Sequence, residues 1–325
     1  MLFLICFHSA KADWVKQNTN TLAWLHDIYF FNETHGFIAG SGGAFLETKD
    51  GGKIWAKRKN FTEGNILQIY FSDDYNGWLL CERNIYNRGA NAVSYLMKTT
   101  DGGENWERVE FKDAGRARIT RIFFNQKGKG FAIGESGAFF ELNDDGAWEK
   151  SPLPIRYLLL DGVFSGDMSG AIVGAGGNVY FTEDAGESWN QANVFSKSAA
   201  KLNSVFFANQ KNGWAVGAEG KIFQTASGGK TWREQNSRVT SDLFDVFFKN
   251  TTEGWAVGDE GVILHTQTGG NVWVSESVNL KHKLEKVIFI GQKGFAIGFG
   301  GTILIYGENS YKNQSAVRPV LQKRN

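Results

Sequence analysis

Tryptophan recurs along this chain at a nearly constant spacing, and that period restricts the fold more than any other feature. Successive tryptophans of the series are 41 to 43 residues apart, with one longer step of 51 residues. Repeats of about 40 residues built from short strands are typical of the blades of a β-propeller. We therefore predict an all-β, seven-bladed β-propeller with four-stranded blades. The series consists of Trp14, Trp55, Trp106, Trp148, Trp189, Trp232 and Trp273.

Each repeat has the same order of segments. An apolar run such as residues 243–248 is followed by a polar turn, a second run at 254–258, a short glycine-containing turn and a third run at 262–266. Short segments rich in branched and aromatic residues, bounded by turn residues, predict β-strands. The tryptophan lies in the fourth strand, where we expect it to act as an apolar wedge between neighbouring blades.

A glycine-rich string precedes five of the tryptophans, as in Lys-Asp-Gly-Gly-Lys-Ile-Trp at 49–55. We call the turn that it forms the marker turn. Its aspartate is expected to hydrogen-bond amides of its own turn while the glycines supply positive φ. Ser227 and Thr268 stand near the same position in two copies, which favours a structural role over a ligand or catalytic role. The aspartates expected to have this role are Asp50, Asp101 and Asp184.

The N-terminal segment is expected to close the ring. The chain has seven first strands but only six tryptophan strands after them, because the last repeat stops after residues 302–306. The surroundings of Trp14 match those of Trp232, including the distance to the next first strand. Trp14 therefore supplies the missing strand of the last blade, and this closure hides the edges that an open sheet would expose.

Composition leaves room for one large domain and limits the partners. Residues 13–306 make up the propeller, and a net charge of +1 over 325 residues gives no general attraction for nucleic acid. The sequence has no run of 18 or more apolar residues, so no membrane span is predicted. We expect a monomer that binds no cofactor.

The two ends differ from the repeats. Residues 1–12 combine a short apolar core with Ala10-Lys11-Ala12, which is a signal-peptidase pattern, and predict a truncated secretory signal and a periplasmic or secreted protein. Ile5 precedes Cys6 where a lipoprotein signal needs a small residue, which disfavours a lipid anchor. Residues 307–325 are polar, contain four basic residues and lack periodicity, so they predict a disordered tail.

Charge is expected to segregate between the two faces of the ring. The blade-to-blade connectors and the turns between second and third strands should open on one face, the connector face. The marker turns should open on the opposite face, the marker-turn face. The connectors carry sixteen lysines and arginines against eight acids. A basic face attracts an acidic or membrane-adjacent partner, and the alternative is an ordinary solvated loop surface. The candidate contact residues are Arg116, Arg118, Arg156 and Arg238.

One loop departs from the repeat and explains the 51-residue step. Residues 82–93 replace the short turn found in the other blades, on the connector face. Long insertions on one face of a repeat protein often bind partners, so Arg83, Tyr86 and Arg88 are further candidates for contact with a protein partner. The alternative is that these residues form a longer surface loop without a function.

A catalytic site is not evident. The five histidines show no metal-ligand spacing, and no glycine-rich phosphate loop lies between a strand and a helix, so we assign no catalytic or metal-binding residues. Glycosidases need two facing carboxylates about 5 to 10 Å apart. Asp27 and Asp245, near the starts of first strands and hence near the axis, are the acids to inspect first.

The chain resembles the photosystem II stability and assembly factor family of bacterial neuraminidase repeat, or Asp-box, propellers. The resemblance rests on the strings Gly-Trp-Ala-Val-Gly-x-x-Gly and Thr-x-x-Gly-Gly-x-x-Trp, which are paired at 213–232 and 254–273. It implies a non-enzymatic, extracytoplasmic propeller that binds a membrane-protein subunit or its exposed loops during assembly through an arginine-rich surface. The family also has members in organisms without photosynthesis, so the resemblance does not specify a photosystem.

The competing class is a secreted glycan-binding or glycoside-hydrolase propeller. Sialidases share the marker turn, but they are six-bladed and need an arginine that follows an Arg-Ile-Pro string near the N-terminus. Nothing before Lys57 fits that pattern. Because one fold hosts many functions, this alternative stays open on the sequence alone.

Overall fold

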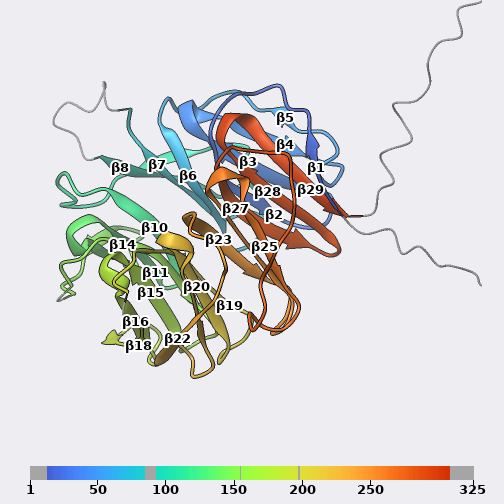
Figure 1. Cartoon of the computed structure of the whole chain (residues 1–325). Helices are drawn as coiled ribbons and strands as arrows, with labels where there is room; N and C mark the ends of the chain where they lie inside the picture. The colour runs from blue at the N-terminus through green and yellow to red at the C-terminus, as the bar shows by residue number, and fades with distance from the viewer. Residues whose placement is uncertain (1–12, 85–92, 154, 197, 308–325) are drawn as a thin grey trace, which may run out of the picture.

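The computed structural model of this chain describes residues 13–84, 93–153, 155–196 and 198–307. Within them, seven antiparallel sheets form a ring in which the first strands of neighbouring blades contact one another, and β1 lies beside β29 (Figure 1). The predicted seven-bladed propeller is confirmed. The expected signal segment 1–12, the tail beyond Gly307, and the candidates Tyr86 and Arg88 lie outside the described residues.

The first four blades follow the chain in order. Blade one contains β2 (Leu25–Phe30), β3 (Gly36–Gly40), β4 (Phe45–Thr48) and β5 (Ala56–Lys57). Blade two contains β6 (Asn65–Phe71), β7 (Gly77–Glu82), β8 (Ser94–Thr99) and β9 (Glu107–Val109). Blade three contains β10 (Ile119–Phe124), β11 (Gly130–Gly134), β12 (Phe139–Leu142) and β13 (Trp148–Lys150). Blade four contains β14 (Leu159–Phe164), β15 (Gly170–Gly174), β16 (Val179–Thr182) and β17 (Asn190–Gln191).

The last three blades complete the ring. Blade five contains β19 (Leu202–Phe207), β20 (Gly213–Gly217), β21 (Ile222–Thr225) and β22 (Thr231–Gln235). Blade six contains β23 (Leu243–Phe248), β24 (Gly254–Gly258), β25 (Ile263–Thr266) and β26 (Val274–Ser275). Blade seven contains β27 (Leu284–Ile290), β28 (Lys293–Gly298), β29 (Thr302–Gly307) and, from the other end of the chain, β1 (Asp13–Gln17).

The spacing Gly-x-x-Gly in the repeats has a steric cause. A short 3₁₀ turn joins strands two and three, as at Ala218–Gly220 in blade five. A Cβ on Gly217 would lie 2.0 Å from the Lys201 carbonyl oxygen, and a Cβ on Gly220, at φ +67°, would lie 2.1 Å from the Val239 carbonyl oxygen. Glycine is therefore required where the connector backbone crosses the end of the blade.

The repeated tryptophans pack against the preceding blade, as predicted for wedges. Trp148 of blade three meets Trp78 of blade two edge to face, with ring centroids 5.8 Å apart. Trp232 lies in one buried cluster with Val173 of blade four, and Trp14 in one with Trp255 of blade six. Such aromatic burial contributes the largest apolar area available to one side chain, so the tryptophan period sets the spacing of blades around the ring.

Closure follows the predicted pairing. β1 runs antiparallel to β29, with Trp14 opposite Tyr306 and Gln17 opposite Ile303. The Trp14 indole N–H donates to Glu276 Oε2 at 2.7 Å, and Gln17 Nε2 donates to the Lys53 carbonyl of blade one at 2.6 Å. The N-terminal strand thus joins blade seven to both of its neighbours.

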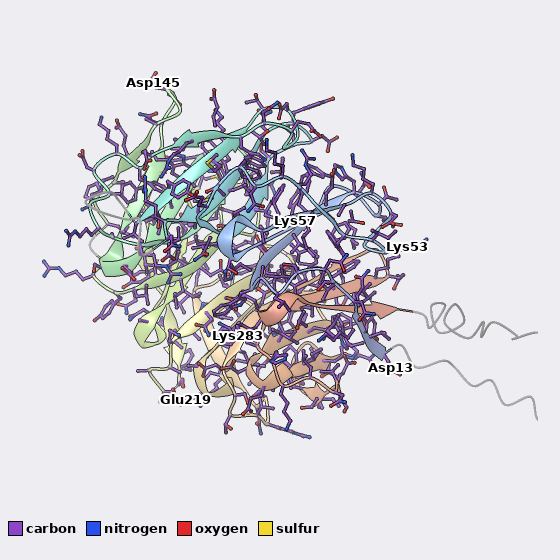
Figure 2. All side chains as sticks on the ribbon, turned by 90° about the horizontal axis from the view of Figure 1, so that it is seen from above. Asp13, Lys53, Lys57, Asp145, Glu219 and Lys283 are labelled. Atoms are coloured by element: carbon purple, nitrogen blue, oxygen red, sulfur yellow. The ribbon has the colours of Figure 1, made fainter. Side chains whose placement is uncertain are left out.

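The two faces form as expected. On the marker-turn face, Gly51 N–H donates to the Thr34 carbonyl at 2.8 Å, which ties a marker turn to the turn between strands one and two. On the connector face, Ser41 N–H donates to the Trp24 carbonyl at 2.8 Å, which ties a 3₁₀ turn to the incoming connector. Figure 2 shows Asp145 and Lys53, from two marker turns, at the edge of the molecule, and Lys283 inside its outline.

Two features differ from the sequence-based expectation. The fourth strand begins directly after the tryptophan in blades one, two, four and six. Lys57 and Arg108, two of the sixteen cations expected in connectors, therefore lie in strands. In addition, β18 (Asn193–Phe195) leaves the connector and pairs in parallel with β22, which extends blade five outward. Polar outer strands lack the apolar alternation that makes inner strands recognisable, and this explains both differences.

Deleting residues 1–20 is expected to destabilise the whole ring, because the deletion exposes β29 as an open edge and removes the Trp14 wedge. The melting temperature, followed by circular dichroism, should fall and the transition should broaden. A protein lacking only residues 1–12 is the matched control, since the described pairing begins at Asp13. An unchanged melting temperature for the longer deletion would contradict closure by this strand.

Candidate functional site: the axial mouth and the connector face

Each first strand presents polar side chains to the axis because its pairing with the second strand contains a β-bulge near the start. The bulge lies between the strand's first apolar residue, such as Leu25 in blade one or Ile66 in blade two, and the residue two positions later in all seven blades. It bends the strand and re-aims its side chains. The residue just before that apolar residue forms the lip of the axial opening, the residue just after it forms the throat, and the next one forms a deeper belt.

The three levels are occupied differently in each blade. In blade order, the lip consists of Trp24, Asn65, Arg118, Leu158, Lys201, Asp242 and Lys283; the throat consists of His26, Leu67, Thr120, Leu160, Asn203, Phe244 and Glu285; and the belt consists of Asp27, Gln68, Arg121, Asp161, Ser204, Asp245 and Lys286.

The belt links neighbouring blades through side chain to backbone hydrogen bonds. Asp27 Oδ2 accepts from the Ile69 N–H of blade two at 2.8 Å, and Gln68 exchanges two 2.8 Å bonds with the Ile122 backbone of blade three. Asp161 and Asp245 repeat this contact toward the next blade, at 2.9 Å each. Buried polar groups with fixed partners of this kind hold elements in one register.

Two cations complete the belt. Arg121 Nε lies 2.7 Å from Asp161 Oδ1, and Lys286 Nζ lies 3.0 Å from Asp245 Oδ1. Burial acts to lower the pKa of Arg121, but the carboxylates of Asp161, Asp27 and Asp245 outweigh it and raise that pKa. Since these three carboxylates come from blades four, one and six, the guanidinium lies where the blades converge.

Asp27 and Asp245, the acids first considered for catalysis, are engaged in this belt. Asp27 is buried, and burial raises the pKa of its carboxyl against the opposing effects of Lys286, Arg121 and the Ile69 amide. Asp245 accepts from Ser204 Oγ and the Val287 amide in addition to Lys286. Both carboxylates therefore fasten one blade to the next.

The opening above the belt is a cavity of about 550 Å³. Its walls come from all three levels, and its acids are paired: Glu82 lies 2.7 Å from Arg118 Nε, and Glu285 lies 3.0 Å from Lys283 Nζ. Lys201 lines the cavity without an ion-pair partner among the described residues. A cavity of this volume lies in the range that holds small ligands or a few side chains.

His26 in the throat is held neutral. Burial, followed by the nearby cations Lys283 and Arg118, lowers the pKa of His26 to about 4. Its ring lies 5.2 Å from the Trp24 ring. The mouth thus carries a neutral imidazole beside an indole at neutral pH.

The predicted contact residues do not all remain available. Arg116, Arg156 and Arg238 are exposed on connectors, and none has an ion-pair partner in the described part of the chain. Arg118 is paired with Glu82 at the lip. Arg83 is only 13% exposed, lies 2.6 Å from Glu110 and stacks over Tyr95.

Arg83 lines a separate hollow of about 1080 Å³ between blades one and two. Arg108 stacks on the same Tyr95 ring, 3.9 Å from its centroid, and shares Glu110. Sequence position alone could not reveal this pairing, because Arg83, Tyr95 and Glu110 meet only after three strands of blade two are aligned.

The marker-turn aspartates bond within their turns. Asp50 Oδ1 accepts from the Ile54 amide at 3.0 Å and from Thr48 Oγ1 at 2.8 Å. In a copy without the carboxylate, Ser227 Oγ accepts from the Thr231 amide at 3.0 Å. Hydrogen bonds lower the pKa of Asp101 to about 2, first the one from the Asn105 amide and then those from the side chains of Asn105 and Thr99.

Comparison with known proteins points to one family. The model of the family described as photosynthesis system II assembly factor YCF48 matches residues 7–85, 139–226 and 226–319. The Photosystem II assembly lipoprotein Ycf48 of Synechococcus sp. (strain CC9902) is 29% identical over 201 residues, covering 55% of this chain and 52% of that protein. Its counterpart in Prochlorococcus marinus (strain MIT 9313) is 25% identical over 282 residues, covering 61% and 84%. The chain thus spans about half the length of the first of these relatives.

Solved structures share the fold at lower identity. A structure described as YCF48 bound to D1 peptide has a TM-score of 0.73 and 22% identity, covering 91% of this chain and 95% of that one. YCF48 from Cyanidioschyzon merolae has a TM-score of 0.70 and 20% identity, covering 91% and 98%. A catalytically inactive virginiamycin B lyase from Staphylococcus aureus, with quinupristin, has a TM-score of 0.75 and 12% identity, covering 92% and 100%. At these identities the fold alone is shared, and it serves different functions.

The substitution Asp245→Ala is expected to lower the free energy of unfolding by about 3 to 5 kcal/mol, because it leaves the partly buried Lys286 ammonium and the buried Val287 amide without their acceptor. Chemical denaturation measures the change. Asp167→Ala, at an exposed turn position, should change stability by less than about 0.5 kcal/mol. A similar small effect at Asp245 would show that the belt does not hold the blades.

The His26 imidazole is expected to titrate near pH 4 by NMR, and Lys283→Gln should raise its pKa because one of the two repelling cations is removed. Since the unfolded chain takes up this proton near pH 6.5, His26 should reduce the stability of the wild-type ring as the pH falls from about 6.5 to about 4. Lys211→Gln, on the marker-turn face, is the control. A wild-type pKa near 6.5 would contradict the burial and charge found at the mouth.

Proposed function

This chain belongs to the family of the photosynthesis system II assembly factor YCF48, and from that premise we propose that it is an extracytoplasmic, non-catalytic assembly factor. Its connector face docks a protein partner, either a membrane-protein subunit or the exposed loops of one. Relatives of this chain carry the names of photosystem II assembly proteins. For this chain, the proposed partner is defined by its chemistry: it is a protein with an acidic surface outside the membrane.

The observation that carries the proposal is the set of exposed connector cations. Arg116, Arg156 and Arg238 come from the connectors after blades two, three and five, so they are spread around one face of the ring. No described carboxylate forms an ion pair with them. Exposed cations on one face raise the local concentration of an acidic partner and orient its approach.

A structure of a YCF48 protein holding a D1 peptide supports peptide binding as the mode of contact. An extended peptide can follow a ring surface that has no deep enzyme-like cleft, and it can combine charged and apolar contacts. We therefore propose that the connector face binds a peptide segment of the partner rather than a folded domain.

Names of relatives also bear on location. The two curated relatives described above are called lipoproteins, which supports a periplasmic or otherwise extracytoplasmic site of action. Within the described residues, no helix has the length and apolar character needed to cross a membrane. An extracytoplasmic propeller would meet the parts of a membrane protein that project from the bilayer.

Capture of a membrane protein from detergent extract tests this function. The immobilised protein should retain its partner at about 0.05 M salt and lose it at about 0.5 M, because screening shortens the reach of exposed charges. The triple variant Arg116→Gln, Arg156→Gln, Arg238→Gln should lose capture at low salt. The matched control is Lys53→Gln, Lys127→Gln, Lys211→Gln, which removes three exposed cations from the marker-turn face. Equal capture by both variants would overturn the proposal.

A further inference from the structure

The axial mouth has an aromatic edge where blades one and seven meet. Blade one contributes Trp24 at the lip, and blade seven contributes Phe299 at the start of the 3₁₀ turn Phe299–Gly301. The two rings meet edge to face with centroids 5.8 Å apart. Phe299 is 49% exposed, and the nearby Leu22 of the same connector as Trp24 is 90% exposed. We call Leu22, Trp24, Phe244 and Phe299 the aromatic corner.

The aromatic corner is not required by the repeat. The position of Phe299 in the 3₁₀ turn is filled in blades one, three, four, five and six by Ser41, Glu135, Ala175, Ala218 and Asp259. These small or polar residues form the same turn with the same backbone contact to the lip. A large apolar side chain that the fold does not need, left exposed beside a cavity, marks an interaction site.

The polar groups at this corner select the charge of a ligand. Lys283 Nζ lies 3.5 Å from the Phe244 ring centroid and 4.9 Å from the Trp24 ring centroid. Each acid that lines the cavity already has a cationic partner, whereas the Lys283 ammonium has three N–H donors and one carboxylate partner, Glu285, which leaves donors for a ligand. A ligand that complements them must therefore supply acceptors.

We propose that the aromatic corner of the axial mouth binds an extended acidic peptide segment of the partner, with an apolar side chain against Trp24 and Phe299 and a carboxylate toward the Lys283 ammonium. A neutral glycan would also stack on aromatic rings, but it would leave the remaining Lys283 donors without a charged acceptor. The inference rests on the proposed function and specifies which part of the connector face holds the peptide.

A blocked, fluorescein-labelled peptide that alternates Asp-Glu pairs with Leu and Phe tests the proposal by fluorescence anisotropy. We expect saturable binding at about 0.05 M salt. Phe299→Ala should weaken it about tenfold, which corresponds to about 1.4 kcal/mol. Lys283→Gln removes the ammonium at the corner and should also weaken binding, whereas Ile54→Ala, which changes an exposed apolar residue on the marker-turn face, should not. Melting temperatures verify that each variant is folded.

Two further probes identify the ligand chemistry. The same peptide with Asn and Gln in place of its acids should bind at least tenfold more weakly, and cellotetraose should not compete. Absence of saturable peptide binding, equal binding by Phe299→Ala and Ile54→Ala, or displacement by cellotetraose would each overturn the inference.

The same capture experiment distinguishes failure of the aromatic corner from failure of docking by the whole connector face. If Phe299→Ala and Lys283→Gln capture the membrane partner normally while the triple arginine variant does not, the corner is excluded and the docking function stands. If the arginine variant also captures the partner, the docking function itself fails.

Discussion

The pairing of β1 with β29 is the constraint on which the ring depends. Each tryptophan wedge needs a blade on both sides, and a chain of seven blades has two open ends unless its termini meet. Trp14 and Gln17 supply that junction, because one packs against blade six and the other bonds to blade one. Closure thereby gives every one of the seven sheets a neighbour on both faces, with a buried apolar cluster at each blade interface.

The belt around the axis fixes the register in which neighbouring blades pack. Apolar contacts of the tryptophans have no preferred direction, whereas the hydrogen bonds of the Ile69 amide to Asp27 and of Gln68 to the Ile122 backbone each need one geometry. The belt is not uniform: it mixes carboxylates, an amide, a hydroxyl and two cations. Each interface therefore has its own chemistry, which favours the sequential order of blades over other pairings.

The tryptophan period was sufficient to predict the fold, the number of blades and the closing strand, since all three follow from apolar residues at fixed intervals. The belt could not be found this way. The alternation of an apolar strand predicts that a polar residue such as Gln68 or Ser204 faces outward, and only the β-bulge turns it toward the axis.

Two of the candidate arginines, Arg83 and Arg118, form ion pairs with Glu110 and Glu82. These contacts depend on tertiary alignment. The aromatic corner was missed because Phe299 lies in a turn, where aromatic residues carry no periodic signal, although its departure from the other five turns was visible in the sequence.

The pairing of Asp13 with Gly307 has a geometric consequence for the whole molecule. Both residues lie at the marker-turn edge of blade seven, on the side opposite the axial mouth. A tether joined directly at either residue, whether lipid, linker or affinity tag, would hold the propeller with its mouth pointing away from the anchoring surface. The pairing of β1 with β29 thus places the points of attachment on one side of the ring and the face proposed to bind the partner on the other.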